Sequence, residues 1–127
     1  MGNIERFSLN VTKIVAALYD QHPRPIMLSF QTIGADKDDS DAVADVSGAI
    51  EWLHRNHLIS GDITRMGGGM IVVSNALLTA SGYRVLSKPE RNANGVPLGQ
   101  FAAALAKEGT AVAPDLTGLV VERLLSS

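Results

Sequence analysis

The stretch Ala49-Ile50-Glu51-Trp52-Leu53-His54-Arg55-Asn56-His57-Leu58-Ile59 decides the fold, because the spacing of apolar residues changes within it. Up to Leu53 they recur every three or four positions, which is the spacing of one buried helical face. The members of this seam are Val43, Val46, Ile50 and Leu53. Beyond it, residues 62–66 alternate polar and apolar, and residues 70–73 are rich in β-branched side chains. Gly67-Gly68-Gly69 separates these segments, so the sequence predicts a helix followed by a two-stranded β-hairpin.

The helix is expected to begin at Ser40 or Asp41, either of which can cap it, and to run to about His57. A polar, acidic loop at residues 36–41 precedes it. Upstream of that loop, residues 26–34 fit either a short strand or a short buried helix, because periodicity does not separate the two.

An amphipathic helix is predicted for residues 4–20, with Asn3 as its N-cap. The prolines in residues 22–25 end this helix, since each disfavours helical geometry in the residue before it. Its expected apolar stripe consists of Ile4, Phe7, Val11, Ile14, Val15 and Leu18.

The chain after the hairpin is expected to be helical. The hydroxyl of Thr79 can cap a short helix that runs to Leu86. Residues 87–97 form a hydrophilic joint, and a further helix is expected from Leu98 to Gly109. A last helix begins near Pro114, a residue suited to a first helical turn.

Two features of this pattern resemble the winged helix-turn-helix superfamily. Leu53, Leu58 and Ile59 match the step from its core helix into the wing, and residues 77–82 (Leu-Leu-Thr-Ala-Ser-Gly) match the start of the helix after the wing. In this second motif threonine caps the helix, and glycine allows a close approach to the hairpin. The resemblance implies a mainly α fold with a small β-hairpin. We expect a winged-helix domain at residues 1–88 and a helical extension at residues 89–127.

Composition narrows the classes of function. The chain has 127 residues, a formal net charge of −2 and no cysteine, which excludes disulfide scaffolds and thiolate chemistry. No apolar run approaches the ~20 residues of a membrane span, so we expect a cytoplasmic protein with no membrane contact. No catalytic motif is present, so neither enzymatic activity nor a cofactor is expected.

The resemblance implies a small dimeric transcriptional regulator that binds double-stranded DNA, with the helix before the hairpin in the major groove. Ser47, Arg55 and Arg65 are the side chains expected to contact DNA. Against this, residues 36–45 carry five aspartates and one lysine, and such a charge balance weakens affinity for phosphate. The alternative is a non-catalytic docking module whose acidic helix face meets a basic protein partner.

Glu51, His54 and His57 are spaced three apart, the best metal-ligand pattern in the chain. Glu51 and His57 are about 120° apart around a helix, so the three do not converge and no metal site is expected. Trp52 is the single tryptophan and is expected to pack under the hairpin, or else to anchor a contact surface.

The first of the two C-terminal helices is rich in small residues, which permit close approach of another helix. The last helix is apolar on more than one side, which favours a second buried surface. We therefore expect a homodimer formed through this region. The alternative is that both helices fold back on the chain's own core. The expected interface residues are Phe101, Leu105, Leu119, Val120 and Leu124.

Overall fold

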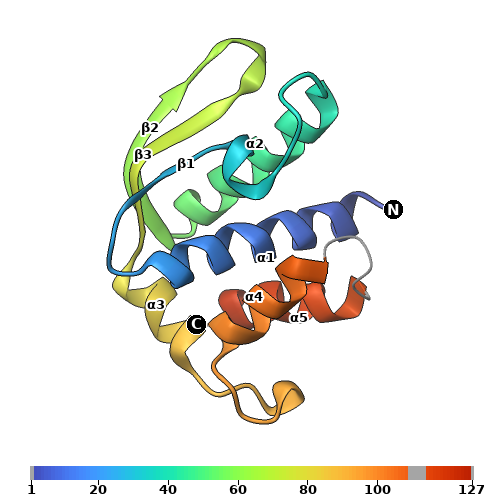
Figure 1. The fold of residues 1–127 in the computed structure, drawn as a ribbon, viewed down its shortest axis with the longest axis vertical. Helices are drawn as coiled ribbons and strands as arrows, with labels where there is room; N and C mark the ends of the chain where they lie inside the picture. The colour runs from blue at the N-terminus through green and yellow to red at the C-terminus, as the bar shows by residue number, and fades with distance from the viewer. Residues whose placement is uncertain (1, 109–113, 127) are drawn as a thin grey trace.

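The computed structural model describes residues 2–108 and 114–126, and is mainly helical with a small antiparallel sheet (Figure 1). The expected fold class is confirmed at this level. In chain order the elements are α1 (Asn3–Gln21), β1 (Ile26–Leu28), η1 (Phe30–Ile33), α2 (Ser40–Arg55), β2 (Ile59–Arg65), η2 (Gly67–Gly69), β3 (Ile71–Leu78), α3 (Ala80–Ser87), η3 (Arg91–Ala93), α4 (Leu98–Glu108) and α5 (Pro114–Leu125). No helix in these described ranges is both long and apolar enough to cross a membrane.

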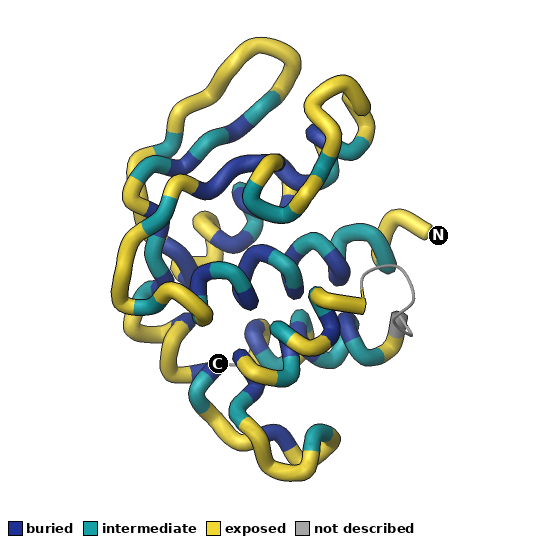
Figure 2. Tube along the Cα trace, viewed as in Figure 1, coloured by how far each residue is buried: buried dark blue, intermediate teal, exposed yellow. Residues whose placement is uncertain are grey.

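Helix α1 lies at the centre of the molecule. It packs against α2 and the sheet on one side and against α4 and α5 on the other (Figure 1). Much of α1 is buried (Figure 2), and the buried residues outside the single expected stripe are Ser8, Leu9, Thr12 and Ala16. Ile4, expected in the core, lies at the free end of α1 and is 81% exposed. Gly2, rather than Asn3, is the N-cap.

The apolar seam of α2 is confirmed, since Val43, Val46, Ile50 and Leu53 are all buried. The helix begins at Ser40, but its N-cap is Asp39 and not Ser40 or Asp41: Asp39 Oδ1 accepts a hydrogen bond from Ala42 N–H at 3.1 Å. It ends at Arg55 and not at His57, which has a left-handed backbone (φ 59°) and turns the chain into β2.

The three strands have the order β1-β3-β2, all antiparallel. The hairpin is confirmed: Arg65 pairs with Ile71, and Gly68 and Gly69 adopt positive φ at the tip between them. Residues 26–34 contain both of the expected alternatives, one after the other: first the strand β1 and then the short helix η1.

The junction between α2, the hairpin and α3 is held by Thr79. Its amide donates to Leu58 O at 3.1 Å, its hydroxyl donates to His57 O at 2.7 Å, and the same oxygen accepts from Gly82 N–H at 3.1 Å. Thr79 is therefore both the expected cap of α3 and a direct link to the turn after α2. Gly82 lies so close to this turn that an added Cβ would meet Leu58 O at 2.3 Å.

The C-terminal helices share one core with the rest of the chain. Leu98, Ala102, Leu105, Val120 and Leu124 belong to the same buried cluster as the seam of α2. Helices α4 and α5 thus pack onto α1. The expected end of α4 at Gly109 falls outside the described residues.

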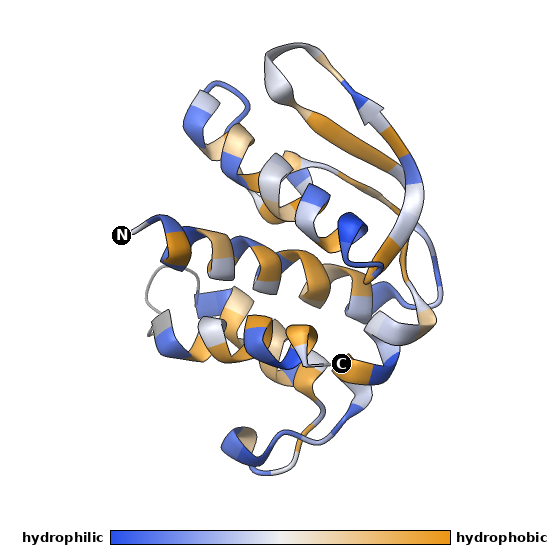
Figure 3. Ribbon diagram, turned by 180° about the vertical axis from the view of Figure 1, so that it is seen from behind, coloured by the Kyte–Doolittle hydropathy of each residue, from blue (hydrophilic) through white to orange (hydrophobic). Residues whose placement is uncertain are grey.

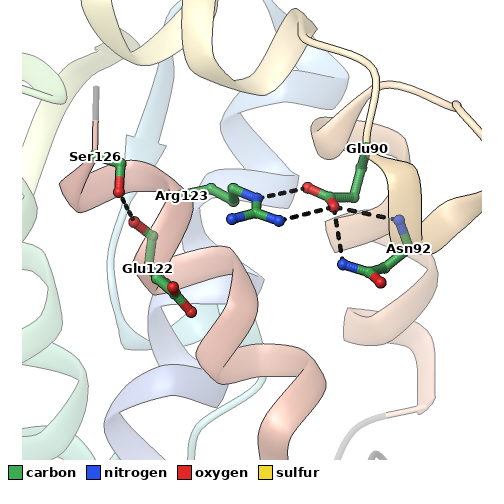
Figure 4. Close-up of polar contacts among 5 residues, drawn as sticks. All are labelled: Glu90, Asn92, Glu122, Arg123 and Ser126. Atoms are coloured by element: carbon green, nitrogen blue, oxygen red, sulfur yellow. Dashed lines mark hydrogen bonds and ion pairs between the residues drawn. The ribbon is translucent and has the colours of Figure 1, made fainter.

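An ion pair links α5 to the segment that connects α3 and α4 (Figure 4). Arg123 of α5 donates to both carboxylate oxygens of Glu90, at 3.0 and 3.3 Å, and Asn92 donates to Glu90 from its backbone and its side chain. Glu90 is only 4% exposed, and the hydrogen bonds from Arg123 lower its pKa, although burial opposes this. The same pair raises the pKa of Arg123.

We predict opposite effects for two helical glycine substitutions. Gly82→Ala forces a Cβ against Leu58 O and should destabilise the fold by roughly 1–3 kcal/mol. Gly48→Ala, where the added Cβ meets nothing within 4 Å, should stabilise it by about 0.5–1 kcal/mol. Urea unfolding followed by circular dichroism measures both, and equal stability of the two variants would contradict the close packing at Leu58.

We predict that Arg123→Met lowers the urea midpoint at neutral pH, because it leaves the Glu90 carboxylate buried without its main partner. The pKa of Glu90 is lowered in the folded chain, so its stabilisation is complete above its usual value of 4.5 and is lost as the pH falls through the lowered folded value. The difference between the wild type and Arg123→Met should therefore shrink in acid. Arg91→Met is the control, and a difference that does not vary with pH would count against the pair.

Candidate functional site

The outer face of α2, together with the hairpin beside it, is the candidate interface. Ser47, one of the residues expected to contact DNA, does not lie on this face. It is buried, and its Oγ accepts a hydrogen bond from Ile71 N–H at 3.1 Å. Ser47 therefore joins α2 to the start of β3, and its expected role at the surface is corrected.

Arg55 and Arg65 do reach the surface, but both bind the same carboxylate. Arg55 Nη2 lies 3.1 Å from Glu51 Oε1, and Arg65 Nη2 lies 3.2 Å from that same oxygen. The first pair is one turn apart on α2, and the second links β2 to α2. Both arginine side chains are exposed, so water screens the pairs, but Glu51 offsets part of the positive charge that a phosphate would meet.

The rest of this face is acidic. Residues 34–70 contain seven carboxylates and three lysine or arginine side chains, a balance of −4. The loop before α2 and the first two residues of the helix are exposed and hydrophilic (Figure 3). Asp45, further along α2, forms an ion pair with Arg6 of α1 at 3.1 Å. The surface presented by α2 therefore attracts cations more than anions.

A shallow groove of about 370 Å³ runs between the start of α1 and α2. Its apolar lining comes from Phe7 and Trp52 together with the small residues Ala44 and Gly48. The rings of Phe7 and Trp52 meet edge to face, with centroids 5.2 Å apart. The aromatic partner of Trp52 is thus on α1, and not under the hairpin as expected. Glu51 and Arg55 also line the groove, so an apolar floor adjoins charged side chains.

Of the residues described, no group of three or more His, Asp or Glu is placed to hold a metal ion. His54 and His57 are exposed, and the helix ends between them. Glu51, His54 and His57 are therefore regularly spaced in the sequence, but the backbone does not bring them together as a coordination site.

The residues expected at a dimer interface fall into two groups. Three of them are buried within the single chain, in the core that α4 and α5 share with α1: Leu105, Val120 and Leu124. Phe101 and Leu119 are half-buried. The first three are thus corrected to core residues, because the chain already covers them, whereas dimerisation itself stays a prediction.

Sequence reasoning missed the residue that organises this site. The sequence pattern points to Glu51 only as a metal ligand, whereas its contacts in the structure are with Arg55 and Arg65. The pair with Arg55 was readable from its spacing of four residues along one helix. The pair with Arg65 was not, because it depends on how the hairpin lies against α2.

Comparison with known protein families, with curated proteins and with solved structures found no match to this chain. The structure establishes a mainly helical fold with a small antiparallel sheet, and the winged-helix resemblance stays a prediction.

We predict that Leu105→Ala lowers the free energy of unfolding by about 2–5 kcal/mol, as expected for a large side chain lost from a core. Leu125→Ala is the matched control, since Leu125 is exposed and should change stability by less than about 0.5 kcal/mol. Urea midpoints measured at several protein concentrations test this. A different result would place Leu105 in an interface between chains: Leu105→Ala would then make the urea midpoint depend on protein concentration without otherwise lowering it.

Proposed function

We propose that this chain is a non-catalytic winged-helix module that binds a basic surface of another protein through the acidic face of α2. The order of elements supports the winged-helix part: a helix, a strand and a short helix precede α2, and a hairpin paired with the first strand follows it. The expected cap and close glycine after the hairpin are both present.

The observation that carries the proposal is the shared contact of Arg55 and Arg65 with Glu51. These are the two cations that the α2 face and the hairpin could offer to DNA. Each binds a carboxylate instead, and the remaining charge on this face is acidic. DNA-binding proteins gain most of their non-specific affinity from neutralised phosphates, which this face supplies poorly.

The groove between α1 and α2 indicates the kind of partner. An apolar side chain of the partner can lie against Phe7 and Trp52, while lysine or arginine beside it meets the half-buried Glu51. Exposed Asp41, about one helical turn from Ala44 of the groove, offers a second carboxylate. A small number of buried anchors surrounded by charged residues is the usual arrangement of protein interfaces. The matching partner is therefore a lysine- or arginine-rich segment with an apolar anchor.

Trp52 provides the readout for a test, because it is the single tryptophan and lies in the groove. A synthetic lysine-rich amphipathic peptide without aromatic residues, and separately random-sequence duplex DNA, are titrated at low and moderate salt. We predict that the peptide changes the emission of Trp52 and that duplex DNA does not bind.

Charge reversal identifies the surface. Asp41→Lys should weaken peptide binding by about twofold to fivefold, in line with one surface charge pair, while Asp115→Lys on α5 should leave it unchanged. Equal loss in both variants would mean that the peptide senses only net charge, and would overturn the proposal. DNA binding that is salt-dependent and abolished by Arg55→Glu with Arg65→Glu would instead support the DNA-binding regulator expected from the resemblance.

A further inference from the structure

A second surface, which does not depend on the proposed function, lies where the end of α1 meets α3. It is a wide depression of about 760 Å³. Its principal lining residues are His22, Tyr83, Arg84, Ser87, Lys88 and Pro89. None of the residues that line the groove between α1 and α2 lines this depression.

Stacked aromatic rings form one part of this lining. The rings of His22 and Tyr83 are nearly parallel, with centroids 4.1 Å apart, and Tyr83 also stacks with Tyr19 at 5.9 Å. Despite these contacts Tyr83 remains 40% exposed. Two elements thus hold an aromatic surface that is fixed by stacking and still open to a ligand.

The charged part of the lining is entirely positive. Arg84 and Lys88 are exposed and four residues apart at the end of α3, and the lining contains no carboxylate. Neither of them takes part in an ion pair within the described ranges. Two like charges at this spacing repel each other weakly, so an anion between them would relieve a small cost.

Two polar atoms in the same lining lack hydrogen-bond partners. His22 Nδ1 and Ser87 Oγ are both buried and have no hydrogen-bond partner among residues 2–108 and 114–126. Leaving such an atom unsatisfied costs roughly 1–3 kcal/mol, and native structures retain few of them. That both occur in one depression, beside free cations, distinguishes it from an ordinary patch of surface.

We propose that this depression binds a small anion with a planar aromatic body. The ring of the ligand lies against the aromatic surface of Tyr83, and its carboxylate or phosphate is held by Arg84 and Lys88. A turn of the Ser87 or His22 side chain then offers a hydrogen bond to a polar group on the ring. Aromatic carboxylates and nucleoside monophosphates share this chemistry.

The probes are chosen to separate the ring from the charge. Salicylate and adenosine monophosphate carry both, adenosine carries the ring alone, and inorganic phosphate carries the charge alone. Isothermal titration and amide NMR shifts of residues 80–89 report binding to the full chain. We expect one or both of the complete ligands to bind, and neither adenosine nor phosphate to do so at the same concentration. Comparing salicylate with adenosine monophosphate shows whether the site takes an aromatic carboxylate or a nucleoside monophosphate.

Variants locate the site. Tyr83→Leu should weaken binding of the complete ligand by about fivefold or more, and Arg84→Gln with Lys88→Gln by about tenfold. Lys107→Gln and Lys37→Gln are the controls, because both remove exposed charges that are not part of this lining. Failure of both complete ligands to bind, equal binding of inorganic phosphate, or equal weakening in the control variants would overturn the proposal.

Discussion

The contact between Thr79 and the turn after α2 is the constraint on which the rest of the structure depends. Three hydrogen bonds of one residue join the end of α2, the end of β3 and the start of α3. They set how the hairpin lies along α2, and hence bring Ile71 to Ser47 and Arg65 to Glu51. The charge of the candidate interface is thus a consequence of backbone packing several turns away.

Helix α1 gives the fold its second organising feature. Because it is buried on two sides, the sheet with α2 and the pair α4 and α5 form layers on either side of it (Figure 1). The two proposed binding surfaces lie on different parts of this frame. One is the acidic face of α2, and the other is the cationic, aromatic depression at α3. Opposite charges on separate faces allow each to take its own ligand.

Local signals in the sequence predicted much of the fold. The seam from Val43 to Leu53, the glycines of the hairpin tip and the cap at Thr79 all act over a few residues, so spacing reveals them. The candidate site was less predictable. Serine is a residue type suited to a surface contact, yet Ser47 is buried. Its hydrogen-bond partner is the amide of Ile71, which lies 24 residues further along the chain. Likewise, the apolar sides of α4 and α5 predict burial but do not say whether the chain's own α1 or a second copy provides it.

Native-state hydrogen exchange of Thr79→Val, compared with Ser81→Ala, tests most directly whether this junction holds the hairpin on α2. Valine keeps the backbone amide but loses the bonds to His57 O and Gly82 N–H. The account predicts faster exchange throughout the hairpin, including Ile71, together with the first turn of α3, and little change in Ser81→Ala. Loss of protection confined to the first turn of α3 would contradict it, because the hairpin would then be held independently of Thr79.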